Sequence, residues 1–226
     1  MFLQFWYNFF NINEKRKAIM TTLKHGFTLA ETLITLAIIG VVAAITIPSL
    51  MQKTQDQELK TAWKKQYAML SQTTAQLVAD NGGDITDIMN TGSQLVESYS
   101  TYYKPTKKCD FTNLVCFTSY TKIKTKTGEM TCPDSQYMLD DGQFMLADGA
   151  TIAVESRTSD PTNDRYLFVD VNGFKNPNTI GKDIFGVRVL RNKILPIGAS
   201  DSITNPRQAC FVTNTGFENS AKYLQE

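Results

Sequence analysis

One uninterrupted apolar stretch dominates the hydrophobic pattern of the 226-residue chain. It runs over residues 27–50 and reads FTLAETLITLAIIGVVAAITIPSL. At 1.5 Å per residue, a helix of this length extends about 36 Å, which is enough to cross a hydrocarbon core about 30 Å thick. We therefore expect residues 27–50 to form the transmembrane half of an N-terminal helix.

The pattern that follows is still helical, but only one side of it is apolar. Residues suited to a buried stripe recur at spacings of three and four: Leu59, Trp63, Tyr67, Leu70, Thr74 and Leu77. This spacing predicts an amphipathic helix over residues 51–81. The Gly82-Gly83 pair marks its end, since glycine suits a helix C-terminus. The stripe predicts packing against a globular domain.

Residues 82–226 have the mixed pattern of a globular α+β domain. Residues 84–108 predict a short helix and a loop, and the segments after them predict strands: 115–124, 137–155, 165–171 and 185–195. The pairs Asp141-Gly142 and Asp148-Gly149 predict hairpin turns. We expect an antiparallel sheet packed on the amphipathic half of the long helix.

The charges beside the apolar run indicate its orientation. Four basic residues precede the run against one acidic residue, Glu14; they are Lys15, Arg16, Lys17 and Lys24. The positive-inside tendency keeps this end in the cytosol and places the rest of the chain outside. The small residue Gly26 lies on the cytosolic side, whereas a secretory signal peptide is cut after its apolar segment. Cleavage at Gly26 would therefore leave the helix in place.

Glu31 does not fit a plain membrane anchor. A charged side chain at the centre of a membrane helix costs roughly 2.5–3.5 kcal/mol on insertion scales. One interpretation is that Glu31 lies near the interface, where it snorkels or stays protonated. The other is that Glu31 has a functional partner.

The stretch from Lys24 to Glu31 (KHGFTLAE), followed by the apolar run and Pro48, resembles the N-terminal signature of type IV prepilins and type II secretion pseudopilins. The resemblance covers about residues 24–77. It implies cleavage after Gly26 by a prepilin peptidase, N-methylation of Phe27, and assembly with other pilin or pseudopilin subunits into a filament.

The same resemblance assigns further roles. Glu31 would face the amine of Phe27 in a neighbouring subunit and fix its register. Pro48 would lie where pilin helices kink or loosen, because proline removes a backbone donor. The fold would be pilin-like, and the protein would lie in the bacterial inner membrane with its N-terminus cytoplasmic. The globular domain would be periplasmic or extracellular.

The segment before the cut, residues 1–26, is long for a prepilin leader. Its first ten residues are MFLQFWYNFF, which is unlike such leaders, whereas a start at Met20 gives the conventional MTTLKHG. A true long leader is the alternative. Both interpretations begin the mature chain at Phe27.

The chain has four cysteines, all beyond the apolar run: Cys109, Cys116, Cys132 and Cys210. An even number in an exported domain predicts two disulfides, with three pairings open. Their spacing does not match the CxxC pairs of a zinc site. Four buried free thiols are the alternative for a cytosolic domain.

The loop over residues 170–183 is rich in oxygen ligands. Asp170, Asn172, Asn178 and Asp183 suit Ca²⁺, and the loop loosely resembles the calcium loops of major pseudopilins. It departs from an EF-hand, because its glycine falls at the fourth position and no Glu closes it. A polar loop held by Asx-turns is the alternative. The acidic residues Asp140, Asp141 and Asp148 are better explained by hairpin turns.

Composition argues against an enzyme. The single histidine is His25, so a chain beginning at Phe27 has none, which excludes histidine triads and histidine-ligated metals. We expect a structural subunit. The alternatives are a minor tip pilin that binds a surface or DNA, and a signal-anchored extracytoplasmic enzyme or receptor domain.

Nucleic-acid binding is disfavoured by the formal net charge of +1. One basic and aromatic group keeps the possibility open; its members are Lys104, Lys107, Lys108, Lys122, Lys124, Lys126, Tyr102, Tyr103 and Tyr120.

Overall fold

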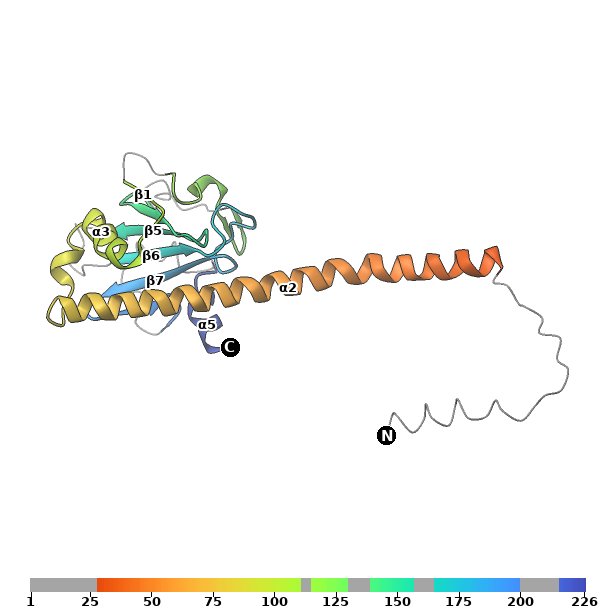
Figure 1. Cartoon of the computed structure of the whole chain (residues 1–226), viewed down its shortest axis with the longest axis horizontal. Helices are drawn as coiled ribbons and strands as arrows, with labels where there is room; N and C mark the ends of the chain where they lie inside the picture. Colours follow the sequence, from red (N-terminus) through yellow and green to blue (C-terminus); the bar gives the residue numbers. More distant parts are fainter. Residues whose placement is uncertain (1–27, 111–114, 130–138, 157–164, 200–215) are drawn as a thin grey trace, which may run out of the picture. The chain divides into compact units, whose positions relative to one another are not determined.

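The computed structural model describes residues 28–110, 115–129, 139–156, 165–199 and 216–226 (Figure 1). The chain divides into two compact units, Met1–Ser49 and Leu50–Glu226. Helix α2, Leu29–Asp80, contributes its beginning to the first unit and the rest to the second. Its end at Asp80 confirms the stop predicted from the glycine pair that follows.

The described part of the first unit is the apolar beginning of α2. Large apolar side chains between Leu29 and Ile47 are each more than half exposed, and no residue of the most apolar stretch is buried. In the described part of the chain, α2 is the one helix long and apolar enough to cross a membrane. Pro48 lies inside the helix. An apolar surface this large indicates contact with lipid or with another protein.

The second unit is built on a six-stranded antiparallel sheet in the order β1-β4-β5-β6-β7-β8. The strands are β1 (Lys107–Cys109), β4 (Gln143–Met145), β5 (Thr151–Ser156), β6 (Arg165–Asp170), β7 (Ile184–Leu190) and β8 (Lys193–Pro196). A separate pair joins β2 (Lys124–Thr125) to β3 (Gly128–Glu129). The remaining helices are η1 (Thr86–Met89), α3 (Gly92–Tyr103), η2 (Tyr120–Lys122) and α5 (Asn219–Gln225).

Both faces of the sheet are covered. One face packs Ile152, Leu167 and Val187 against α3 and the buried stripe of α2, which runs along the sheet (Figure 1). The opposite face packs Phe168 and Ile184 against loops and the C-terminal segment. Strands β5 and β6 are therefore buried at every position, which explains why they do not alternate clearly between apolar and polar residues.

Trp63 joins three elements of this core. Its ring is fully buried and stacks on Phe185 of β7, with centroids 4.7 Å apart. Its Nε1 donates to the carbonyl of Ser220 in α5 at 2.9 Å, and Ser220 Oγ accepts from the amide of Gly186 at 3.1 Å. Helix α2 is thus held to β7 and α5 at one residue.

The α+β prediction is confirmed, with corrections to individual segments. The turn at Asp148-Gly149 joins β4 to β5 as predicted, and residues 185–195 form the hairpin of β7 and β8. Helix α3 fulfils the expectation of a short helix in residues 84–108, whereas β1 and α5 were not anticipated.

The predicted strand over residues 115–124 is wrong except at Lys124, which begins β2. Its amides at Cys116 and Phe117 donate to the side-chain Oε1 of Gln143, at 3.1 and 2.9 Å, and a 3₁₀ turn follows. Asp141-Gly142 does not form the predicted tight hairpin within the described residues. Gly142 instead immediately precedes β4 with φ of 137°, where a Cβ would lie 2.8 Å from Val96 Cγ2.

Replacing Trp63 tests its role in the core. Trp63→Ala should lower the free energy of unfolding by about 3–5 kcal/mol, because it leaves a cavity and an unpaired buried carbonyl. Trp63→Phe keeps a ring against Phe185 and should cost less. Urea unfolding of the detergent-solubilised chain, followed by circular dichroism, measures both. The exposed Gln72→Ala on the same helix is the control, and an equal effect there would contradict this role.

Candidate functional site

The N-terminus of α2 is closed by a capping box between Thr28 and Glu31. The amide of Thr28 donates to Glu31 Oε2 at 2.8 Å, and the amide of Glu31 donates to Thr28 Oγ1 at 3.2 Å. The Thr28 hydroxyl also donates to Glu31 Oε2 at 2.9 Å. This reciprocal pair satisfies two amides that a helix start leaves without partners. The sequence contained its signal, a Thr followed three residues later by Glu.

The Glu31 carboxylate lies on an apolar helix surface. Leu29, Leu33 and Ile34 around it are 79%, 58% and 60% exposed. Both bonds from Thr28 end on Oε2, so Oε1 has no hydrogen-bond partner among the residues that the structure describes. The carboxylate can therefore accept a further donor without losing its cap.

Residues 22–47 match the family model of the prokaryotic N-terminal methylation motif. The chain carries the type IV pilin-type signature. The match includes the Gly26–Phe27 junction and Glu31, and it ends one residue before Pro48. No curated protein and no solved structure matches the chain.

The signature supports a pilin-like or pseudopilin-like protein and implies processing by a prepilin peptidase and assembly with other pilin subunits. Gly26 and Phe27 lie outside the described residues. The contact between Glu31 and the amine of a neighbouring Phe27 therefore stays a prediction, as does the role of Pro48.

One disulfide is present in the described residues, between Cys109 and Cys116. Both cysteines are buried. The bond ties the end of β1 to the segment that Gln143 Oε1 holds, while Gln143 Nε2 donates to the carbonyl of Leu139 at 2.9 Å. Cys132 and Cys210 lie outside the described residues. The structure thus resolves one of the predicted disulfides.

The structure brings the four predicted ligands of the Asp170 loop, residues 170–183, together. The amides of Asn178 and Thr179 donate to the carboxylate of Asp183 at 2.7 and 2.6 Å. Asp170 accepts from the amide of Asn172 at 3.3 Å. The Asp170–Asn172 bond is an Asx-turn, as the alternative interpretation expects, whereas the bonds to Asp183 come from amides earlier in the chain.

The missed member of this group is Thr118. Its hydroxyl lies 3.2 Å from Asp170 Oδ2 and 3.1 Å from Asn178 Oδ1, with geometry suited to donating to either. A hydroxyl has a single proton, so it satisfies only one of the two oxygens at a time. Asn172 Oδ1 is also buried and has no hydrogen-bond partner. Two acceptors of the loop therefore share one hydroxyl proton, and a third has no partner among the described residues.

Burial and repulsion shift the acids of the loop toward their neutral forms. Asp170 and Asp183 are both fully buried. Burial, together with the charge of Asp183, raises the pKa of Asp170 to about 8. Burial also raises the pKa of Asp183, although bonds from the amides of Thr179 and Asn178 oppose the shift. At neutral pH the folded loop favours a proton on Asp170.

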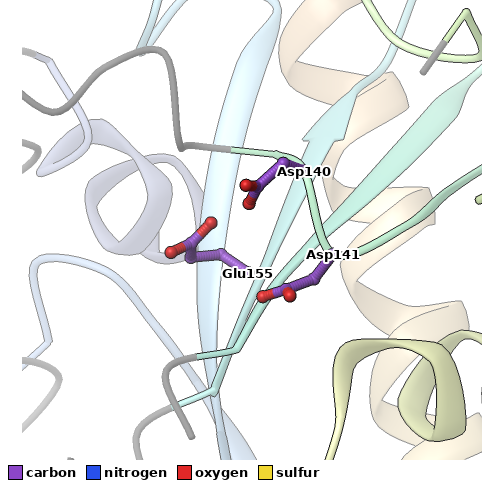
Figure 2. A group of neighbouring side chains, drawn as sticks. All are labelled: Asp140, Asp141 and Glu155. Atoms are coloured by element: carbon purple, nitrogen blue, oxygen red, sulfur yellow. The ribbon is translucent and has the colours of Figure 1, made fainter. Parts of the chain in front are cut away.

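A second acidic group forms away from this loop. Asp140, Asp141 and Glu155 each have a carboxylate oxygen within 4.8 Å of those of the other two. Figure 2 shows these three neighbouring side chains. The amide of Leu139 donates to Glu155 at 3.2 Å, and the amide of Ser156 donates to Asp141. Asp141 is thus bonded to β5, which corrects its assignment to a hairpin turn.

Asp148 does belong to its predicted turn, where its Oδ1 accepts from the amide of Ala150 at 3.2 Å. Its Oδ2 also accepts from Lys65 Nζ at 2.6 Å and Gln66 Nε2 at 2.9 Å. The acidic group of Figure 2 gives no sign of a ligand beyond the clustering itself.

The basic and aromatic group proposed for nucleic acid is divided in the structure. Lys108 pairs with Glu97 at 2.7 Å and Lys126 with Glu218 at 3.4 Å. The ring of Tyr103 packs against Phe144 in the core, and the Tyr102 hydroxyl donates to Asp80. These contacts do not favour a base-stacking surface in the described part of the chain.

The Asp170 loop predicts an unusual dependence of stability on pH. Because the folded pKa of Asp170 lies above the ordinary value of 3.8, the folded chain keeps a proton that the unfolded chain releases. In chelator-containing buffer, the free energy of unfolding should fall between about pH 4 and pH 8, and the proton on Asp170 contributes at most about 1.4 kcal/mol per pH unit to this slope. Urea titrations across this range measure the slope, and Asp170→Asn should flatten it. A slope that Asp170→Asn leaves unchanged would assign it to other groups.

Proposed function

We propose that the chain is a structural subunit of a type IV pilus or a type II secretion pseudopilus. It is cleaved after Gly26, N-methylated at Phe27, and assembled through α2. The observation that carries this proposal is the methylation motif at residues 22–47, leading into a helix whose apolar surface no described residue covers.

The exposed apolar part of α2 suits two environments, one before filament assembly and one after it. Before assembly, lipid surrounds the apolar surface, since a helix is one of the few structures that satisfies its own backbone in a bilayer. After assembly, the same surfaces of neighbouring subunits pack against one another. The subunit can thus pass from membrane to filament without exposing apolar surface to water.

The second unit supports an exported location. The second unit contains the Cys109–Cys116 disulfide. Disulfides form and persist in oxidising compartments and are rare in the cytosol. The helix and motif fit an inner-membrane anchored pilin. We assign the N-terminus to the cytoplasm and the second unit to the periplasm or the cell exterior.

To test this proposal, the intact mass and the N-terminal sequence are measured for protein taken from its native membrane, with and without active prepilin peptidase. With the peptidase, the chain should begin at an N-methylated Phe27. Without it, the leader should remain, which also identifies the start at Met1 or Met20. Cleavage after residue 50, or a leader retained despite active peptidase, would contradict the proposal.

Glu31→Gln extends this experiment from cleavage to assembly. The amide keeps an acceptor for Thr28 but removes the charge that would pair with a neighbouring amine. Cleavage should continue, while the filament yield should fall at least tenfold, since breaking a buried ion pair costs about 3–5 kcal/mol. Thr28→Val is the matched control, because it removes the hydroxyl of the cap and keeps the carboxylate. Normal filaments from Glu31→Gln would exclude the proposed pair.

We also propose that Ca²⁺ binds the Asp170 loop, in competition with the proton on Asp170. The supporting observations are two buried carboxylates that repel each other and the unpaired Asn172 Oδ1. Asp170, Asn172, Asn178 and Asp183 would hold the ion, all through hard oxygens.

Calcium should therefore stabilise the chain most at high pH. At about 1 mM Ca²⁺, a concentration suited to extracellular sites, the melting temperature at pH 8 should rise, and the destabilisation between pH 4 and pH 8 should diminish. Mg²⁺ at the same concentration should do neither, and Asp183→Asn should remove the Ca²⁺ response. Equal melting in Ca²⁺ and chelator would leave the loop as a proton-linked structure.

A further inference from the structure

A charged hollow of about 230 Å³ lies on the second unit, beside the turns of α2 that directly follow the apolar run. Its lining comes from α2, from the Asp170 loop and from α5: Lys53, Asp56, Gln57, Lys60, Lys182 and Tyr223. Segments far apart in the sequence thus build its walls.

Charges of both signs border this hollow. Lys182 Nζ lies 3.7 Å from Asp56, and Lys60 Nζ lies 2.5 Å from Glu226 and 4.3 Å from the centre of the Tyr223 ring. Lys53 makes no ion pair with any residue that the structure describes. The loose Lys182–Asp56 contact leaves both groups available to a ligand, and Lys53 adds an uncompensated positive charge.

The place of Lys53 in the sequence sets the depth of the hollow. Lys53 lies three residues after Leu50, about 4.5 Å along a helix, and Lys60 lies about 15 Å along it. The headgroup layer occupies about 5–8 Å on each side of the hydrocarbon core. On the membrane anchoring proposed above, Lys53 therefore lies among the headgroups.

We propose that the hollow binds the headgroup of a zwitterionic phospholipid with a primary amine, of the phosphatidylethanolamine type. The phosphate contacts Lys53 and Lys182, and the ammonium group contacts Asp56. The hollow carries positive and negative side chains, which complement the negative phosphate and the positive ammonium group of this headgroup. A purely anionic headgroup would instead place a negative charge next to Asp56. This inference rests on the membrane anchoring in the proposed function.

The test uses the full chain in nanodiscs of phosphatidylcholine with equal amounts of phosphatidylethanolamine and phosphatidylglycerol. Native mass spectrometry counts the lipids that the released protein retains. Phosphatidylethanolamine should be enriched over the other two lipids. Lys53→Gln with Lys182→Gln should lower its retention about fivefold per lysine, and Asp56→Asn should remove its preference over phosphatidylglycerol.

The matched control is Lys122→Gln with Lys124→Gln, which removes the same charge from exposed positions elsewhere. Equal loss in both double variants, or no loss in either, would overturn the headgroup site. Cross-links from Lys53 to a second copy in place of retained lipid would assign the hollow to a subunit interface and also overturn it. Vesicle flotation separates the two proposals, because a chain that fails to float contradicts the anchoring, whereas floating without selective retention contradicts only the lipid site.

Discussion

The apolar surface of α2 before Leu50 is the constraint on which the remaining features depend, because no described part of the chain covers it. Exposure of this much apolar surface to water is strongly unfavourable, so the helix requires lipid or another protein around it. Both environments have a low dielectric constant, which makes the one carboxylate near the helix start costly and therefore informative. The capping box lowers that cost by giving Glu31 two donors, and it leaves one oxygen for a partner.

The same helix has the opposite character after Leu50, where it is part of a core. Trp63, Leu70 and Leu77 are buried against the sheet, and Thr74 bonds to the hydroxyl of Tyr99 at 2.7 Å. The six-stranded sheet would expose one apolar face without this stripe. The sheet of the second unit therefore depends on the later half of α2 for much of the cover of this face.

Features determined by local sequence could be predicted, and features determined by distant contacts could not. The stripe of α2 follows from its spacing, and the Asp170 loop gathers its ligands because they lie within fourteen residues of sequence. Gln66 was missed because a polar residue does not signal burial; it is held by Asp148, which comes from the turn between β4 and β5. The segment before η2 was mistaken for a strand because its pattern cannot reveal that the Gln143 side chain takes its amides. The acidic group of Figure 2 depends on the position of Glu155 in β5, which sequence spacing does not give.

The capping box also bears on how Glu31 could act in assembly. A Thr-x-x-Glu pattern has an ordinary explanation, since it stabilises the start of a helix in any protein. On an apolar helix surface, capping alone does not explain the choice of Glu. A cap made by Ser or Asn would satisfy the helix start without placing an ionisable carboxylate in that surface. A cation at this charge would explain why the position holds an acid. After cleavage, the amine of Phe27 in the same chain would lie four residues before Glu31. In a filament, the Phe27 amine of a neighbouring subunit could pair with Glu31 equally well. Capping by Thr28 through Oε2 alone is compatible with either amine at Oε1.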